Sequence, residues 1–588
     1  MALNETQKLR MNLVAGAIGV AFLAVLGRLY QIQCLDHRKY ANLARKQHLT
    51  RIPIPVHRGT IFDSSGSALA ICLPVDSVYA DPAGVKEKSK AAWKLAPVLG
   101  MQPQDVFGEL IHDSRFVWLK RRMALDERPK IDRLRIKGIG FIREFRRGYP
   151  QGTLLGHTLG FVGIDNNGLE GLELTLDKFL SGEPGYDIAQ RDAAGTPISM
   201  PELKRNPGVN GLDVHLTIDG NVQQIAEEEL KKAGDEWRPI GGVAVVMNPQ
   251  NGDILALANW PPFNPNSFAD MSPEELKKLS HNSAVLDAYE PGSTFKPITV
   301  SGALEDNIVS ENTLFDCEDG TAVLLGGRRL RDTHGYGVQP MSQVVIRSSN
   351  IGMGKLGMMV GKANLYRYVR SFGFGRSTGL PLQGESPGLF NPPSRWSKYT
   401  ITSVPMGQEV SVTAVQIVAG FSAIANGGNL MKPRLIKKVV NPDANEVVAE
   451  FGPEVVRRVI SEQTARRVTA ILVGVVEDEH GTGRRAQIPG YAVAGKTGTA
   501  QKALEGARGY SDSDYTSSFV GYAPAGNPRV CVLVKIDTPR AGSSHYGGTV
   551  AAPPVREIIR RTLAYMGVPP DPSRVAKTDG TESGSSGD

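Results

Sequence analysis

The first clear feature of the hydrophobic pattern is an apolar segment close to the amino terminus. Residues 13–26 (LVAGAIGVAFLAVL) carry no charge, and apolar character continues to Ile32 with Arg28 as the one charged residue between them. A helix rises about 1.5 Å per residue, so a helix over 11–32 is long enough to cross a bilayer. A cleavable signal peptide is the rival interpretation, but no A-x-A-like cleavage site follows the apolar core. The pattern therefore predicts an uncleaved membrane anchor over 11–32, preceded by a short tail, 1–10.

After the anchor the pattern is mixed. Residues 58–70 are rich in turn formers, and 91–99 show the period of a helix. The run 206–211 (NPGVNG) contains residues that interrupt both helices and strands, which marks a domain boundary. We predict a non-catalytic α+β module over 33–210 and a larger domain over 211–570.

The larger domain begins and ends with strand-like runs and is helical between them. A helical period is followed by two apolar runs that are joined by a loop containing Asn-Gly, at 221–234, 242–247 and 254–258. Helical patterns predominate from Val285 to Ala425. Three further strand-like runs and a last helix follow at 491–494, 517–523, 530–536 and 554–566. Strands at both ends predict an α+β fold with one antiparallel sheet flanked by helices. The tail 571–588, rich in Ser, Gly, Thr and Asp, is predicted to be disordered.

Composition and charge exclude several classes of function. Hydrophobic residues make up 41% of the chain and charged residues 22%, as in ordinary folded proteins. The net charge is +7, but the 67 basic and 60 acidic residues are interspersed without a dense basic block, so we expect no nucleic-acid binding. The histidines form no HExxH-like cluster, and we expect neither a catalytic metal nor another cofactor.

The cysteines are few and lie far apart in the sequence: Cys34, Cys72, Cys317 and Cys531. Since no CxxC occurs, a zinc ribbon and a thioredoxin-type motif are excluded. One long-range disulfide stays open, although buried apolar thiols are the favoured interpretation.

Three short motifs in the second half carry the candidate chemistry. They occur in the order Ser293-Thr294-Phe295-Lys296, Ser348-Ser349-Asn350 and Lys496-Thr497-Gly498-Thr499. Each motif alone is weak evidence. However, S-x-x-K and K-[ST]-G each occur once in the chain, and the three follow the order of a serine acyl-transferase site. Their conjunction therefore predicts a catalytic site.

The spacing of the first motif suits an activated serine. A helix that starts near Ser293 places Lys296 one turn further on, within reach of the serine hydroxyl. A hydroxyl needs a neighbouring base, and Lys296 can be that base if burial and the charge of Lys496 lower its pKa. The free N–H groups of the helix amino terminus would stabilise a developing oxyanion.

The other two motifs suit substrate binding. Residues 496–499 follow the β-prone run 491–494 and are predicted to lie on a strand, with the hydroxyls of Thr497 and Thr499 available to a substrate carboxylate. Gly498 would let a substrate backbone approach closely. Ser348, Ser349 and Asn350 have an alternative interpretation, because they could simply cap the helix that follows.

These motifs resemble those of the class B penicillin-binding proteins, the peptidoglycan D,D-transpeptidases, and the resemblance covers nearly the whole chain. Residues 289–296 match the family's Tyr-Glu-Pro-Gly-Ser-Thr-x-Lys, and Met406-Gly407-Gln408 also matches. In the amino-terminal module the family pedestal is matched by Arg58-Gly59, Asp63, Gly66 and 160–173. Ser64 departs from the family's usual Arg.

The resemblance implies a role for each motif residue. Ser293 would attack the penultimate D-Ala carbonyl of a peptidoglycan stem peptide, activated by Lys296, with Ser348 and Lys496 relaying the proton. Asn350 would take part in catalysis by positioning the peptide amide, and the N–H groups of Ser293 and Thr499 would form the oxyanion hole. The substrate-binding residues would be Ser349, Thr497, Gly498 and Thr499. An amine from a neighbouring strand would resolve the acyl-enzyme, and β-lactams would acylate the same serine.

The resemblance also implies where the protein works and with which partners. The flanking charges leave the orientation of the anchor open, but the family's substrate lies outside the cytoplasmic membrane, so 1–10 would be cytoplasmic. The length and short pedestal favour the septal (FtsI-type) division branch over the elongation branch. Division members imply a polytopic glycosyltransferase and other division-complex membrane proteins as partners.

Four other functions compete with this interpretation. Residues 490–497 (GYAVAGKT) formally match a nucleotide-binding P-loop, although a P-loop follows a strand and opens a helix. A β-lactamase shares the three motifs but adds a Glu-bearing loop that the chain does not resemble. A non-catalytic β-lactam sensor or division scaffold and a D,D-carboxypeptidase stay open.

Overall fold

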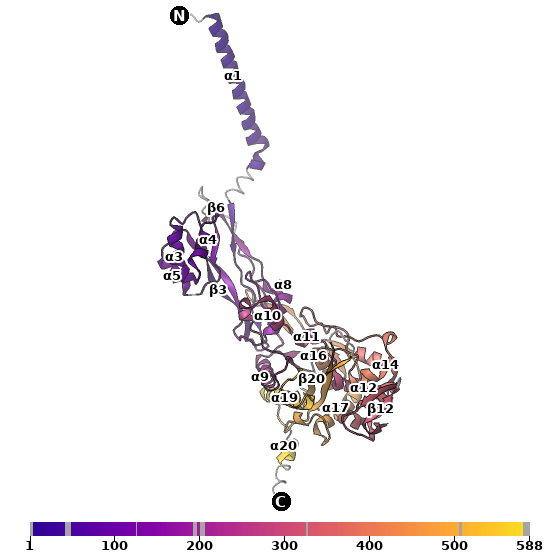
Figure 1. Ribbon diagram of the computed structural model, residues 1–588. Coiled ribbons are helices and arrows are strands. Elements are labelled where there is room, and N and C mark those ends of the chain that lie inside the picture. The colour runs from indigo at the N-terminus through magenta and orange to yellow at the C-terminus, as the bar shows by residue number, and fades with distance from the viewer. Residues whose placement is uncertain are drawn as a thin grey trace. The chain divides into compact units, whose positions relative to one another are not determined.

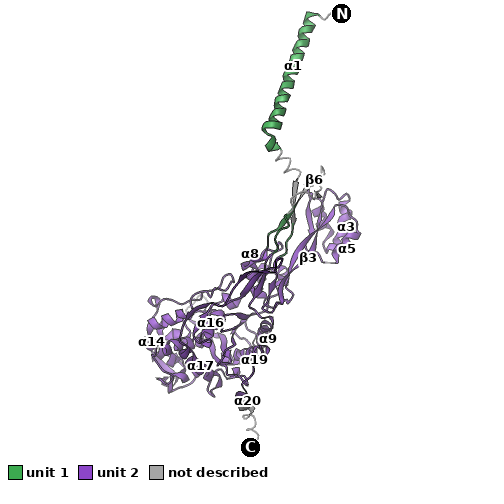
Figure 2. Cartoon of the chain, turned by 180° about the vertical axis from the view of Figure 1, so that it is seen from behind, with its two compact units in different colours: residues 1–57, 182–210 green, residues 58–181, 211–588 purple. Residues whose placement is uncertain are grey.

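In the computed structural model (Figure 1) the chain divides into two compact units, which are coloured separately in Figure 2. One comprises residues 1–57 and 182–210, and the other 58–181 and 211–588. The structure describes residues 4–40, 49–124, 126–191, 197–199, 206–324, 327–504 and 509–579.

The first unit contains the predicted anchor. Helix α1 (Glu5–Tyr30) is opened by Asn4 and Gln7, whose side chains form a capping box, and it continues as the π-helix η1 (Gln31–Leu35). By length and composition the segment Glu5–Leu35 can cross a membrane. None of the residues of α1 and η1 is buried. The unit also holds an antiparallel sheet of β1 (Leu49–Ile54), β6 (Gly185–Arg191) and β7 (Pro197–Ser199).

The second unit begins with a mixed sheet that strands from distant parts of the sequence build together. Its order is β17-β16-β8-β2-β3-β4, and β5 also pairs with β3. The strands are β2 (Ile61–Phe62), β3 (Ala68–Ala80), β4 (Val117–Lys120), β5 (Ile139–Gly148), β8 (Asp213–Leu216), β16 (Ile436–Asn441) and β17 (Glu446–Glu450). A small core beside it is formed with α3 (Lys88–Leu99), α4 (Pro103–Leu110) and α5 (Glu127–Arg133). Helix α3 includes the predicted helix 91–99.

A buried cluster of charges holds this part of the unit together. The Glu173 side chain is fully buried and accepts from Arg58 Nε at 2.7 Å and from Arg147 Nε at 2.6 Å. Asp177 pairs with Arg58 at 2.6 Å. Buried charges are tolerated only when they are paired, so this cluster depends on all of its members. It forms although the chain has Ser64 where the family usually has Arg.

The candidate site belongs to a second sheet, which is antiparallel throughout. Its order is β10-β9-β21-β20-β19. The strands are β9 (Gly241–Met247), β10 (Ile254–Trp260), β19 (Ala494–Ala503), β20 (Tyr510–Ala523) and β21 (Val530–Asp537). The predicted antiparallel sheet with strands from both ends of the domain is therefore confirmed. The predicted strand that carries the third motif is confirmed as β19, but it begins at Ala494 rather than at Tyr491, after a turn with Gly490 at φ 82°.

Helices cover both faces of this sheet. Helices α9 (Gly220–Trp237) and α19 (Ala552–Tyr565) contribute to one core, and α9 is capped by Asp219, as the sequence permits. The other, larger core contains α12 (Lys296–Glu305), α13 (Met341–Ile346), α14 (Asn350–Ser371), α16 (Ala414–Ala425) and α17 (Glu462–Glu477). The α+β class predicted from the sequence is confirmed.

Short elements complete the unit. The helices are α6 (Gly156–Leu159), α7 (Gly171–Thr175), α8 (Asp177–Leu180), α10 (Pro273–Leu279), α11 (Ser283–Leu286), α15 (Thr400–Ser403), α18 (Gly547–Val550) and α20 (Pro572–Asp579). The strands are β11 (Leu314–Asp316), β12 (Thr321–Leu324), β13 (Arg328–Arg331), β14 (Val338–Pro340), β15 (Asn429–Met431) and β18 (Val455–Arg458). Helix α20 occupies the start of the tail that the sequence predicts to be disordered, and 580–588 lie outside the described residues.

The four cysteines are free thiols in the structure. Cys317 and Cys531 are buried, as the favoured interpretation requires, whereas Cys34 is exposed and Cys72 half-buried. The long-range disulfide that the sequence left open is not formed between these four residues.

Candidate active site

The first motif lies on a turn that the rest of the domain holds in place. The 3₁₀-helix η3 (Gly292–Phe295) carries the half-buried Ser293 and runs directly into α12. Tyr289 exchanges both backbone hydrogen bonds with Val412, each at 2.9 Å. Gly292 N donates to Gly407 O at 3.1 Å. We call residues 289–293 the nucleophile turn.

Gly407 explains why the segment 406–408 belongs to the site. It has φ 76°, and a Cβ at this position would lie 2.2 Å from Gly292 O. Only glycine combines this backbone conformation with so close an approach. The sequence shows only that this segment resembles the family. The contact between Gly407 and Gly292 explains why a glycine is required here.

Lys296 connects the first motif to the second. Its side chain is fully buried, and Nζ donates to oxygens of three consecutive residues. The acceptors are Ser348 O at 2.6 Å, Ser348 Oγ at 3.1 Å, Ser349 O at 3.3 Å and Asn350 Oδ1 at 2.9 Å. The sequence predicts that the amine reaches the hydroxyl of Ser293, but no hydrogen bond of that hydroxyl is found within the described residues. Catalytic hydrogen bonds are often formed only with substrate present, so Lys296 stays a candidate base.

The second motif lies where α13 ends and α14 begins. Ser348 adopts φ 62°, which turns its carbonyl and hydroxyl toward Lys296. Ser349 is the amino-terminal cap of α14, and its buried hydroxyl accepts from Gly352 N at 3.0 Å. The capping that the sequence left as an alternative is therefore real for Ser349.

Asp332 is a member of the site that the sequence analysis missed. Its carboxylate accepts from Ser349 Oγ at 2.6 Å, from Asn350 N at 2.5 Å and from Ile351 N at 3.2 Å. A carboxylate is favoured at a helix amino terminus, where N–H groups are unpaired. Asp332 lies before the second motif in a segment without a motif of its own, so no pattern in the sequence could single it out.

The third motif brings a second buried lysine to Ser348. Lys496 is fully buried in β19, and its Nζ donates to Ser348 Oγ at 3.0 Å. Thr497 Oγ1 donates to Thr482 Oγ1 at 2.9 Å, and Thr499 Oγ1 accepts from Gly547 N at 3.0 Å. Thr482 and Gly547, like Asp332, were not predicted.

Gly498 has a structural role in the described chain. A Cβ here would lie 2.4 Å from Ser518 Oγ, 2.9 Å from Thr294 Cγ2 and 3.0 Å from Pro291 O. The sequence predicts that Gly498 admits a substrate backbone. The structure shows a close approach of the nucleophile turn and of β20 to Gly498, which a side chain would push away, and the approach of a substrate stays a prediction.

The electrostatics of the two lysines suit proton transfer. Burial lowers the pKa of Lys296 to about 7, partly opposed by the negative charge of Asp332. Burial, and then the charge of Lys296, hold the pKa of Lys496 well below its ordinary value. A base is most effective when its pKa lies near the working pH. A serine hydroxyl shared by two such lysines can pass a proton between them.

The position of β19 leaves room for an extended ligand. It is the edge strand of the five-stranded sheet, so one side of its backbone is not paired within that sheet. An edge strand can accept an extended peptide as a further strand. The geometry therefore combines a serine, a buried amine and a strand edge that is unpaired within its sheet.

Comparison with known protein families agrees with this geometry. Residues 242–560 match the penicillin binding protein transpeptidase domain. Residues 53–216 match the penicillin-binding protein dimerisation domain. The chain belongs to the penicillin-binding protein family.

Its relatives place it among the class B enzymes of that family. Stage V sporulation protein D of Bacillus subtilis (strain 168) is 36% identical over 98% of this chain and 88% of its own length. The peptidoglycan D,D-transpeptidase FtsI of Escherichia coli (strain K12) is 32% identical over 96% of this chain and 92% of its own length. Penicillin binding protein 3 of Mycobacterium tuberculosis, in its crystal structure with aztreonam, is 29% identical with a TM-score of 0.69 over 89% of this chain and 99% of that one. This penicillin-binding protein is a peptidoglycan D,D-transpeptidase of the serine type.

The P-loop interpretation of residues 490–497 is wrong. Lys496 and Thr497 lie inside β19, whereas a P-loop lysine stands at the opening of a helix. The polar groups of both residues form hydrogen bonds within the protein, Lys496 with Ser348 and Thr497 with Thr482.

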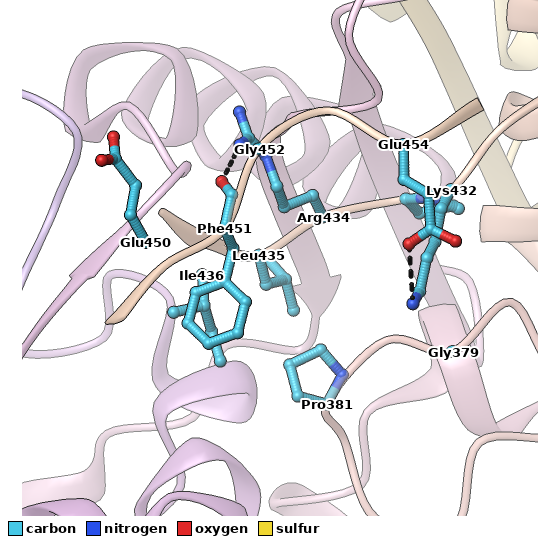
Figure 3. A pocket seen from close by; sticks show the side chains of 11 residues that line it. Gly379, Pro381, Lys432, Arg434, Leu435, Ile436, Glu450, Phe451, Gly452 and Glu454 are labelled. Atoms are coloured by element: carbon cyan, nitrogen blue, oxygen red, sulfur yellow. Dashed lines mark hydrogen bonds and ion pairs between the residues drawn. The ribbon is translucent and has the colours of Figure 1, made fainter. Parts of the chain in front are cut away.

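A further pocket is shown in Figure 3. It has a volume of about 420 Å³ and is lined by residues of β16, β17 and their neighbours, among them Leu435, Ile436 and Phe451. Among its charged residues, Lys432 pairs with Glu454 at 3.2 Å, and Arg434 pairs with Asp253 at 2.5 Å. None of the predicted site residues lines it.

Proposed function

We propose that this transpeptidase cross-links stem peptides through an acyl-enzyme on Ser293 and that it works in septal cell-wall synthesis. The observation that carries the assignment of the serine is its place on a turn directly before a buried lysine of lowered pKa. That lysine is Lys296. Lys296 and the equally buried Lys496 both donate a hydrogen bond to the hydroxyl of Ser348.

The proposed reaction follows from these positions. A stem peptide pairs with the edge of β19, with its carboxylate near Thr497 and Thr499. The oxygen of Ser293 attacks the penultimate D-Ala carbonyl and loses its proton to neutral Lys296. The backbone N–H groups of Ser293 and Thr499 stabilise the tetrahedral oxyanion.

Collapse of that intermediate completes acyl transfer. The carbon–nitrogen bond to the terminal D-Ala breaks, and the leaving amine takes the proton through Ser348, which both lysines contact. Asn350 orients the peptide amide, and Ser349 holds the helix terminus that carries Asn350. The amine of a second stem peptide then attacks the ester and restores Ser293.

The finer parts of the proposal rest on relatives. Penicillin binding protein 3 of Mycobacterium tuberculosis has been solved with aztreonam and with ampicillin, which supports acylation of Ser293 by β-lactams. The similarity to FtsI supports the septal branch over the elongation branch. We further propose that Glu5–Leu35 anchors the protein, with the bulk of the chain outside the cytoplasmic membrane beside a division glycosyltransferase.

The test is labelling of the detergent-solubilised full chain with a fluorescent penicillin, followed by intact mass over hours. We expect one persistent adduct on the wild type and none on a folded Ser293→Ala variant. An adduct on Ser293→Ala would refute the assignment of the nucleophile. Incubation with stem peptide and an acceptor amine then separates the alternatives: cross-linked product supports transpeptidation, D-Ala release alone indicates a carboxypeptidase, and neither indicates a sensor.

A further inference from the structure

A lysine is buried in the sheet beneath the candidate active site. Lys535 lies on β21 and is only 4% exposed. Its strand is otherwise apolar up to Asp537, and alternation places Lys535 on the same face as Cys531 and Leu533, which belong to the larger core. An ammonium on an apolar face costs stability, so a lysine here calls for another explanation.

The ammonium lies against the nucleophile turn. Lys535 Nζ is 4.9 Å from the centre of the Tyr289 ring, within the range of a cation–π contact. Tyr289 is half-buried, and its hydroxyl oxygen is buried without a hydrogen-bond partner within the described residues. Ser293 follows four residues later in the chain.

The register of the sheet places Lys535 under the same turn by an independent route. Lys535 pairs with Ser518 of β20, and Ser518 pairs with Gly498 of β19. Residues directly opposite each other share one face of a sheet. The missing side chain of Gly498 would meet Thr294 and Pro291 O, so that face carries the nucleophile turn.

The two carboxylates near the Lys535 ammonium form ion pairs with other residues. Asp287 is engaged by His281 at 2.6 Å, and Asp537 by Lys502 at 2.9 Å. Burial lowers the pKa of Lys535, while these two carboxylates act in the opposite direction. Apart from the backbone pairing of β21, no hydrogen bond or ion pair of the Lys535 ammonium is found within the described residues.

We propose that Lys535 is a positioning residue for Ser293, which acts by holding the ring of Tyr289 and with it the nucleophile turn. This inference rests on the proposed role of Ser293. Lys535 does not touch substrate. Its contribution is to the geometry of attack, and misplacement of a nucleophile by a fraction of an ångström slows a reaction without weakening binding.

The test compares Lys535→Met with the wild type in the full chain. Stopped-flow labelling over a range of fluorescent penicillin concentrations separates the acylation rate constant from the dissociation constant of the preceding complex. We expect the rate constant to fall about tenfold and the dissociation constant to stay unchanged. The Tm should equal or exceed that of the wild type, because a buried charge has been removed.

Two further variants separate positioning from general stability. Lys535→Arg keeps a cation that stacks on aromatic rings and should recover most of the rate. Leu533→Met, on the same strand and face, should leave the rate unchanged. A wild-type rate in Lys535→Met would overturn the inference. So would a slow variant whose Tm also falls and whose rate Lys535→Arg does not recover.

A double-mutant cycle tests whether Lys535 acts through the ring. If it does, Lys535→Met combined with Tyr289→Leu should be no slower than Tyr289→Leu alone. Independent, multiplying losses would overturn the inference. Failure of the wild type itself to be labelled would instead refute the proposed function, so the two failures are distinguishable.

Discussion

At the scale of single residues, the site depends on groups whose properties burial has changed. Lys296 and Lys496 are ordinary lysines in the sequence, yet both are fully buried and both contact Ser348. Desolvation disfavours the charged form of an amine, which turns a permanent cation into a base. Asp332 limits this effect at Lys296 and holds the helix terminus beside it.

The first prediction concerns the pH dependence of acylation. The pKa of Lys296 is lowered to about 7, so its neutral, proton-accepting form increases as the pH rises through that value. We expect the rate of Ser293 labelling to rise between about pH 6 and pH 8 and then to level off. Rates measured by stopped flow with a penicillin that is stable over this range check the expectation. Because the two lysines interact, the midpoint belongs to the pair. A rate that is flat across this range would contradict Lys296 as the base.

At the scale of elements, a strand, a turn and a helix terminus together form the site. Strand β19 carries the third motif at the edge of its sheet, η3 carries the serine, and the cap of α14 presents Ser348 and Asn350. Gly498 and Gly407 are the points at which backbone from separate elements comes too close for a side chain. Close packing makes such contacts intolerant of even one added methyl group.

The second prediction tests the contact between β19 and the nucleophile turn. Gly498→Ala places a Cβ 2.4 Å from Ser518 Oγ and 3.0 Å from Pro291 O, so the turn must move. We expect loss of most labelling of Ser293 and a destabilisation of about 1–3 kcal/mol, measured by labelling and by denaturant unfolding. Gly526→Ala is the matched control, because a Cβ there meets nothing within 4 Å. Equal behaviour of the two variants would show that the contact is unimportant.

At the scale of the whole molecule, the family's dimerisation domain and transpeptidase domain share structure. The sheet β17-β16-β8-β2-β3-β4 combines strands from both halves of the sequence. Asp63 continues this connection, since its carboxylate accepts from Gly220 N at 3.1 Å at the start of α9. The buried cluster around Glu173 stabilises the dimerisation domain, and it is remote in sequence from the three motifs.

The third prediction separates stability from catalysis. Glu173→Gln leaves Arg58 and Arg147 buried with one carboxylate fewer, which should cost about 3–5 kcal/mol in the free energy of unfolding. We expect the labelling rate per folded molecule to stay unchanged, because Glu173 contacts no residue of the three motifs. Urea unfolding and labelling of the same preparation check both halves. Lys130→Ala, which breaks the exposed pair with Asp126, should change neither quantity measurably. A slowed reaction in folded Glu173→Gln would show that the cluster also acts on the site.

The sequence by itself determined what local pattern and residue chemistry can determine. The apolar run near the amino terminus, the periods of α3, α9 and α19, the strands β9, β10, β20 and β21, and the three motifs are all encoded within short segments. The hydrophobic period and the order of the motifs can be read without knowing which segments pack together. The α+β class and the family could therefore be predicted.

Only the tertiary structure decided which residues complete the site. No sequence pattern indicated Asp332, because its role is to accept hydrogen bonds from backbone N–H groups of another segment. Gly407 matters because of Gly292, and Lys535 because of Tyr289, each more than 100 residues away. The start of β19 at Ala494 was likewise missed, because pairing with β20 overrides local strand propensity. Contacts between distant segments set burial, and burial sets the pKa of a lysine and the space beside a glycine.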